Sequence, residues 1–146
     1  MAIVDLYKKI ITDLHSTLTE DSTLQTAMGG TVNLYLLWAV PDAAFPYLVH
    51  RLDLVSPDWS PVQRGTYLID IWYDSPNADG ILAIRSQVIT LIDELYYIAI
   101  SEHDGAWFWL QSDMPVTEPE EGIWHYNISF AMKVLVEAAI ASRLRR

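Results

Sequence analysis

The sequence predicts an α+β fold: a single domain with a mainly antiparallel sheet of about five strands and two helices packed on one face. Two stretches, 3–18 and 76–96, space their apolar residues as amphipathic helices do. The stretch 124–136 instead carries an apolar or aromatic residue at every second position, which is typical of a strand with one buried face. The chain has 146 residues, 51% of them hydrophobic, which is enough for one core. We therefore expect one domain over 1–146, in the order helix-strand-strand-strand-helix-strand-strand.

The last predicted strand carries the clearest pattern. A helix would scatter its alternating apolar residues around the whole circumference, whereas a strand gathers them on one face. Polar residues such as His125 and Lys133 occupy positions in between. We expect this strand near the centre of the sheet. The alternating residues are Trp124, Tyr126, Ile128, Phe130, Met132, Val134 and Val136.

The residue pattern in the first half of the chain predicts one helix and three strands. After the helix Ile3–Leu18, a strand is expected over Val32–Trp38, because β-branched and aromatic residues dominate there. The strands Tyr47–Val55 and Thr66–Tyr73 then form a long hairpin with a proline-rich tip at 56–61.

The second half predicts a helix and two strands. Ser75 is expected to cap a helix that begins at Pro76 and runs to about Tyr96. A strand that starts with Ala106–Leu110 follows, and then an exposed acidic loop from Pro115 to Gly122. Residues 137–146 form a short helix or a frayed tail.

Charge and composition exclude several classes of protein. Nine basic residues against nineteen acidic residues give a net charge of −10, which disfavours proteins that bind the phosphate backbone. DNA that merely passes through a lumen of like charge stays compatible with this charge. The chain has no cysteine, so disulfides, thiolate metal sites and thiol nucleophiles are excluded. We expect no signal peptide, no membrane span and no membrane partner.

No pattern predicts catalytic, cofactor-binding or metal-binding residues, and we expect no cofactor and no enzyme activity. The four histidines lie far apart and form no short ligand motif. One alternative is a small hydrolase or ligand-binding domain that uses Asp53, Asp70 and His50, because carboxylates that share a strand face can do acid–base chemistry. We favour a solvated sheet face for these carboxylates.

The candidate interface residues lie in or next to two loops. Trp59 stands between two prolines at a loop tip, where it either anchors a partner or folds back over the sheet. The predicted interface set is Trp59, Asp58, Arg64, Glu118, Glu120 and Glu121.

The order of elements, together with five segments, resembles a known family. The segments are Pro41 to Tyr47, Tyr47-Leu48-Val49, Tyr67 to Asp74, Ile92-Asp93-Glu94-Leu95 and Gly122-Ile123-Trp124-His125. In this order they resemble the tail-completion, or tail-terminator, proteins at the neck of long-tailed bacteriophages. The resemblance covers nearly the whole chain and consists of packing and turn patterns.

The resemblance implies a structural virion protein, assembled in the host cytoplasm and located in the tail or neck. Such proteins form a ring, usually of six copies, that ends tail-tube polymerisation and joins the tail to the head. The implied partners are further copies of this chain, a tail-tube protein, and a head-side connector or stopper, with DNA passing through the lumen. A stopper or a tube subunit is the alternative within the same particle.

Overall fold

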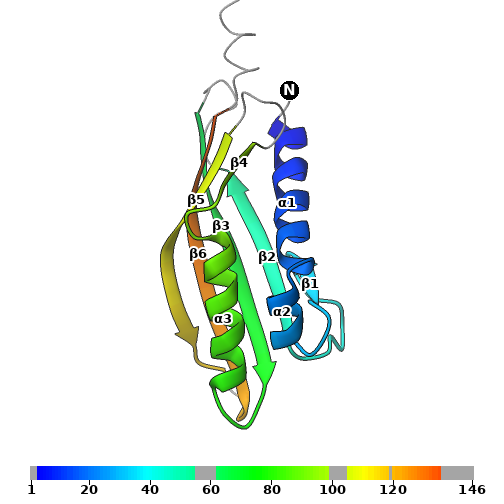
Figure 1. Cartoon of the computed structure of the whole chain (residues 1–146). Coiled ribbons are helices and arrows are strands. Elements are labelled where there is room, and N and C mark those ends of the chain that lie inside the picture. The colour runs from blue at the N-terminus through cyan, green and yellow to red at the C-terminus, as the bar shows by residue number, and fades with distance from the viewer. Residues whose placement is uncertain (1–2, 55–61, 99–104, 119, 136–146) are drawn as a thin grey trace, which may run out of the picture.

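The computed structural model describes residues 3–54, 62–98, 105–118 and 120–135. Helices α1, α2 and α3 lie over one face of a six-stranded sheet with the order β1-β2-β3-β6-β5-β4 (Figure 1). The predicted α+β class and the order of the main elements are confirmed, and α2 and β4 are additional short elements. The bounds are α1 Ile3–Thr19, α2 Ser22–Ala27, β1 Leu34–Leu36, β2 Tyr47–Leu54, β3 Val62–Asp74, α3 Asp79–Ile92, β4 Tyr96–Ile98, β5 Gly105–Val116 and β6 Ile123–Leu135.

The sheet is built around the antiparallel pair β3 and β6. Their register runs from Val62 opposite Leu135 to Asp74 opposite Ile123. β2 pairs antiparallel with β3, and β5 pairs antiparallel with β6. Only β1 runs parallel to its neighbour, β2, among the strand pairs of the described residues. The sheet is therefore mainly antiparallel, as predicted.

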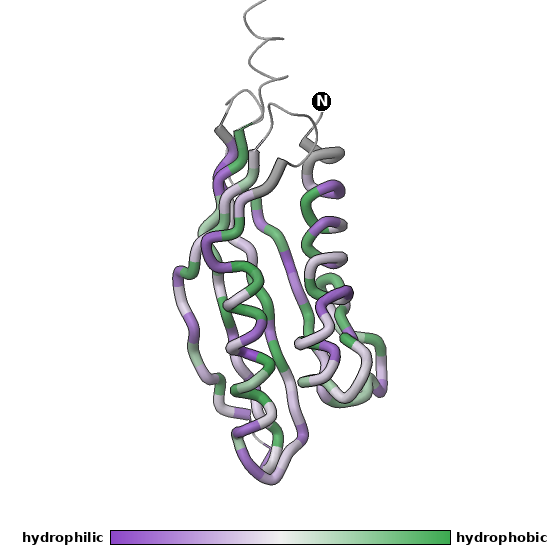
Figure 2. The backbone as a smooth tube through the Cα atoms, viewed as in Figure 1, coloured by the Kyte–Doolittle hydropathy of each residue, from purple (hydrophilic) through white to green (hydrophobic). Residues whose placement is uncertain are grey.

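The core lies between the helices and the sheet, and the alternation along β6 determines which side chains enter it. Ile128, Phe130, Met132 and Val134 are buried, and Trp124 and Tyr126 pack against them. Hydrophobic and hydrophilic residues alternate along α1 and α3, as expected of helices with one buried face (Figure 2). The helical core residues include Ile10, Leu14 and Leu18 from α1 and Ile81, Ile84, Val88 and Ile92 from α3. An ion pair from Arg85 of α3 to Asp113 of β5 links the two layers.

The bounds predicted for the second long helix are wrong at both ends. α3 begins at Asp79, and Asn77, not Ser75, accepts a hydrogen bond from the backbone N–H of Asp79, at 3.0 Å. The helix ends at Ile92, because Glu94 adopts a positive φ of 62° and turns the chain. The Leu95 carbonyl then accepts from the Phe108 N–H at 2.9 Å. Pairing with β5 thus overrides the helical spacing, and Tyr96 begins β4.

Three predicted strand bounds also change. The first strand spans Leu34–Leu36, not Val32–Trp38, because Leu37 has φ 70° and ends the ladder. β3 begins at Val62, before the predicted Thr66. β5 extends to Val116 beyond a bulge after Leu110, so Pro115 lies in a strand rather than in a loop. Proline is tolerated there because β4 pairs only with the first part of β5 and leaves the rest as an edge.

Residues 55–61 and 136–146 lie outside the described residues. The proline-rich tip at 56–61, the segment 137–146, and the predicted strand ends Val55 and Val136 therefore stay predictions. No described helix has the length and apolar character that a membrane crossing requires.

The β2–β3 pairing requires glycine at position 65. Gly65 lies opposite Leu54, and a Cβ at this position would collide with the backbone oxygen of Asp53. We expect Gly65→Ala to lower the free energy of unfolding by about 1–3 kcal/mol, the usual cost of forcing an extra methyl group into a packed site. Chemical denaturation measures the loss. The matched control, Thr66→Ala on the same strand, should cost less than about 1 kcal/mol. Equal stability of the two variants would contradict the close approach.

Candidate functional site

The face of the sheet opposite the helices carries a row of stacked rings. Tyr47, Trp72 and His125 are register partners on β2, β3 and β6, so their side chains stand side by side. The ring centroids lie 5.3 Å apart between Tyr47 and Trp72 and 4.1 Å apart between Trp72 and His125. Phe45 extends the row with a centroid 5.3 Å from that of Tyr47. This open face is therefore partly aromatic and not simply a solvated polar surface.

A polar cluster adjoins the ring row. We call His125, Asp70, Glu118 and Asn127 the His125 cluster. Nε2 of His125 lies 2.7 Å from Oδ1 of Asp70, and Nδ1 lies 2.6 Å from Oε1 of Glu118. Asn127 donates to the same Asp70 oxygen at 3.0 Å. Burial lowers the pKa of His125, but the hydrogen bonds and the negative charges of Asp70 and Glu118 outweigh burial and raise the pKa above 6.5.

The geometry of the His125 cluster favours a structural role. Both ring nitrogens of His125 are held by carboxylates, so neither is available to take a proton from a substrate. Glu118 lies in the loop between β5 and β6, and its bond to His125 fastens that loop to the sheet. Among the described residues, no group of three or more acidic or histidine side chains has the geometry to hold a metal ion.

The structure does not bring together the alternative acid–base set. His50 points into the core, where its Nδ1 lies 2.7 Å from the hydroxyl oxygen of Tyr67, and the residue is 2% exposed. Burial, and to a lesser degree the nearby charge of His15, lowers the pKa of His50 to about 4. Asp70 lies on the opposite face of the sheet. Asp53 pairs there with Arg51, at 3.4 Å from Nε to Oδ2.

The predicted interface residues occupy three different settings. Arg64 lies exposed on β3. Glu118 is partly buried in the His125 cluster, whereas Glu120 and Glu121 are exposed in the loop before β6. Asp58 and Trp59 lie outside the described residues. The interface roles of these six residues stay predictions.

An exposed apolar loop next to β1 was not predicted from the sequence. We call residues 36–45 the Trp38 loop. Trp38 is 74% exposed, the largest fraction for a large apolar side chain in the described parts of the chain. Four more apolar side chains of this loop are at least 41% exposed: Leu36, Leu37, Val40 and Phe45. The unbroken apolar run Leu36-Leu37-Trp38-Ala39-Val40 was a signal, but its strand propensity placed residues up to Trp38 in the predicted first strand.

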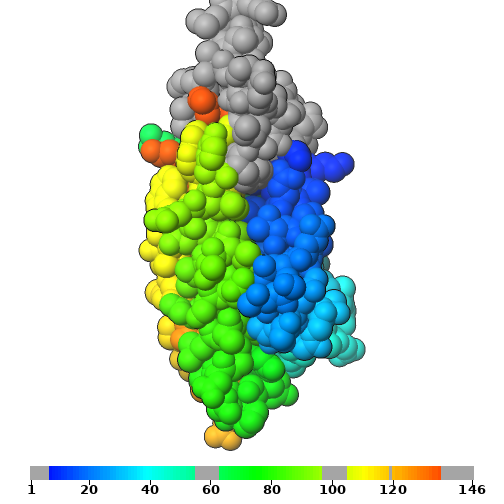
Figure 3. Space-filling view, viewed as in Figure 1, coloured from blue at the N-terminus to red at the C-terminus, as the bar shows by residue number. Residues whose placement is uncertain are grey.

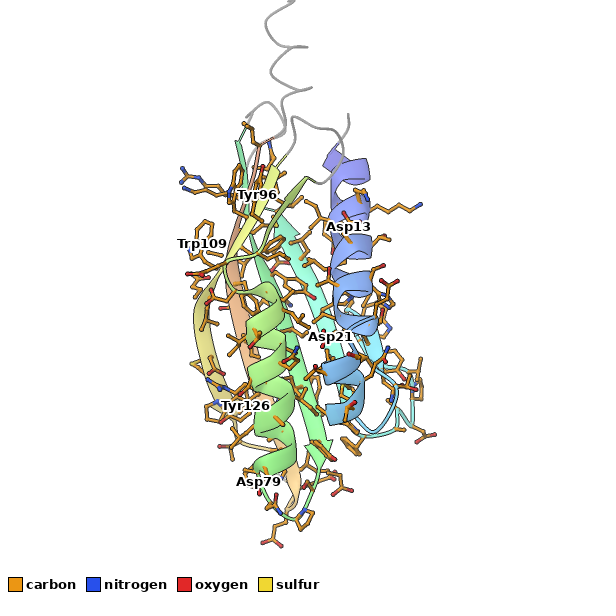
Figure 4. All side chains as sticks on the ribbon, viewed as in Figure 1. Asp13, Asp21, Asp79, Tyr96, Trp109 and Tyr126 are labelled. Carbon is orange, nitrogen blue, oxygen red and sulfur yellow. The ribbon has the colours of Figure 1, made fainter. Side chains whose placement is uncertain are left out.

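A groove lies at the other edge of the sheet, and we call it the edge groove. Its volume is about 720 Å³, and its walls include Leu95, Trp107, Trp109 and Leu135. Lys133, also in the lining, has its ammonium nitrogen 5.8 Å from the centroid of the Trp109 ring. Figure 4 shows the Trp109 side chain projecting outward beside β5, on the same side of the molecule as Tyr96. The volume falls in the range of cavities that hold a small ligand or several side chains.

The fold has counterparts among solved structures. No family model and no curated protein matches the sequence significantly. A chain in the virion of a native gene transfer agent particle superposes with a TM-score of 0.64 at 13% sequence identity. The match covers 84% of this chain and 91% of that chain. A second solved chain matches with a TM-score of 0.58 at 14% identity, over 84% of this chain and 94% of its own length. The chain shares this fold.

The pKa shifts of His50 and His125 have opposite signs, so we expect them to change the stability of the fold with pH in opposite directions. The pKa of His50 is lower in the folded chain, at about 4, than in the unfolded chain, near 6.5. Between these values the unfolded chain binds the proton more readily, so acidification from pH 6.5 to pH 4 should remove roughly 3 kcal/mol of stability. Denaturation curves over this range check the loss. His50→Asn should flatten this acid limb, and an unchanged limb would contradict the role of His50.

We expect His125 to affect the stability of the fold as the pH rises above about 6.5. Because its pKa is raised by folding, its stabilising contribution is fully present below about pH 6.5 and disappears as the pH rises through the folded pKa. In wild-type protein we expect stability to fall over that window, and His125→Asn should remove the fall. The measurement is the free energy of unfolding against pH above 6.5. A wild-type curve identical to that of the variant would show that the Asp70 and Glu118 contacts do not favour the protonated ring.

Proposed function

We propose that this protein is a structural component of a phage-like particle. It forms a ring, with six copies as the expected number, at the head-proximal end of the tail. The ring ends tail-tube polymerisation and presents its other face to the head-side connector or stopper. On this proposal the protein is a non-enzymatic virion component that assembles in the host cytoplasm.

The observation that carries the proposal is the fold match to a chain of a gene transfer agent virion over 84% of this chain. That match alone concerns the fold. The proposal gains support from the element order and the segments Pro41 to Tyr47 and Gly122 to His125, which resemble tail-terminator proteins.

The surface chemistry also supports assembly. Large apolar side chains are exposed in the Trp38 loop and along β5, where Trp107 and Trp109 are each 39% exposed. Exposed apolar groups of this size are typical of surfaces that bind other proteins. The net charge of −10 suits a lumen through which DNA passes without binding.

The test combines purified protein with tail tubes of the same particle. We expect negative-stain micrographs to show rings and a single ring on one end of each tube, with tube elongation stopped. An unrelated acidic protein of similar size is the control and should leave tube ends growing. Self-polymerisation into tubes would instead identify a tube subunit. Binding to connectors, with no binding to tube ends, would identify a stopper.

A further inference from the structure

Two exposed apolar surfaces lie at opposite edges of the sheet. The Trp38 loop follows β1, which forms one edge. The edge groove lies toward the other edge, where residues of β5 and Leu95, just before β4, line it, and it extends inward to β6 and to Arg64 of β3. Figure 3 shows the residues around β1 (cyan) on one side of the molecule and those of β5 (yellow) on the other. Within one copy, the sheet therefore holds the two surfaces apart.

The Trp38 loop is held by the backbone in a conformation that leaves its apolar side chains outside. The Leu37 N–H donates to the His50 carbonyl at 3.0 Å, and the Trp38 N–H donates to the Leu36 carbonyl at 2.9 Å. The Ala43 N–H closes a turn on the Val40 carbonyl at 3.2 Å. A loop that is ordered before binding loses less conformational entropy on binding. An exposed tryptophan on such a loop is a typical interface anchor.

The edge groove is a concave, mainly apolar surface that also carries a cationic side chain, whereas the Trp38 loop is a protruding apolar segment with one carboxylate. Its walls are the indole rings of Trp107 and Trp109 with Leu95 and Leu135, which suit an aromatic and aliphatic insert. Its lining also carries Lys133, whose ammonium nitrogen lies 5.8 Å from the centroid of the Trp109 ring. Asp42 is the only charged residue of the loop. The loop therefore offers apolar side chains to an apolar groove, and one carboxylate, that of Asp42, to the ammonium group of Lys133.

We propose that the Trp38 loop of one copy binds the edge groove of the next copy. Because the two surfaces differ and lie at opposite edges, the contact is head-to-tail, and repetition generates a ring when the rotation closes. This inference rests on the proposed function, for which it names the subunit contact. A symmetric contact between two Trp38 loops fits less well, because it would bring two Asp42 carboxylates together with no cation from either loop.

The decisive experiment mixes two variants that each lack one surface. Trp38→Glu disables the loop and keeps the groove, and Trp109→Glu disables the groove and keeps the loop. By mass photometry and analytical ultracentrifugation, each variant alone should self-associate at least tenfold more weakly than wild type. Their mixture should form dimers that contain one copy of each and grow no further, because only one intact contact exists. Met114→Glu, at a 54% exposed apolar residue of β5 outside the groove, is the matched control and should assemble as wild type.

Melting curves must accompany these measurements. Trp38→Glu should leave the melting temperature nearly unchanged, because the side chain is mostly exposed. If Trp109→Glu does not fold, the groove can be tested instead by exchanging the charges of Lys133 and Asp42, which keeps every aromatic ring in place. Lys133→Glu should weaken self-association, and Asp42→Lys in the same chain should restore it. A swap without restoration would contradict the proposed pairing.

Several results would overturn the inference while leaving the proposed function intact. Wild-type protein that stays monomeric at every concentration yet caps tail tubes would exclude a contact between free copies. Rings formed by Trp38→Glu as readily as by wild type would place the contact elsewhere. Loss of tube capping without loss of self-association in Trp38→Glu would mean that the loop binds the tube. A failure of the proposed function looks different: wild-type protein neither forms rings nor binds tube ends.

Discussion

The ladder between β3 and β6 is the constraint on which the rest of the structure depends. Both strands have 13 residues, and their pairing fixes every side chain of the sheet centre on one face or the other. A slip of one residue would move Ile128 and Phe130 to the open face and His125 toward the core. The helices cover the face that this register makes apolar. The same register lines up Trp72 with His125 on the open face, so the core and the surface chemistry have one origin.

Much of this ladder was predictable from the sequence, because alternation over so many positions leaves one consistent interpretation. Trp124 to Val134 gave the strand and its buried face correctly. The ends of the elements were not predictable to the same degree. Leu95 and Tyr96 continue the helical spacing of α3, yet they pair with β5, and no local pattern reveals a partner more than ten residues away. The prediction that Trp38 lies in the first strand was wrong for the opposite reason. Its local strand propensity is high, but the positive φ of Leu37 turns the chain out of the sheet before Trp38.

The candidate surfaces were harder to predict than the fold, since a side chain's surroundings depend on tertiary packing. Glu118 was predicted to be an exposed interface residue, and it lies partly buried against His125 instead, so any interface role for it must act together with the His125 cluster. His50 and Asp70 illustrate the same limit. Their residue types suit acid–base chemistry, but strand parity places them on opposite faces, which only the register of β2 on β3 determines.

The edges of the sheet explain why side chains rather than backbone groups should govern association. β1 and β4, the two edge strands, have three residues each. An edge this short offers few backbone hydrogen bonds to an added strand. β5 continues beyond β4 as an open edge, but there the Phe108 N–H donates to the Leu95 carbonyl, the Leu110 N–H donates to an Asp93 carboxylate oxygen, and Pro115 has no N–H to offer. A contact of adequate strength must then come from groups such as Trp38 and Trp107, which lie beside the edges. On the proposed loop-to-groove contact, these different groups let each copy bind one neighbour on either side, as a closed ring of more than two identical subunits requires.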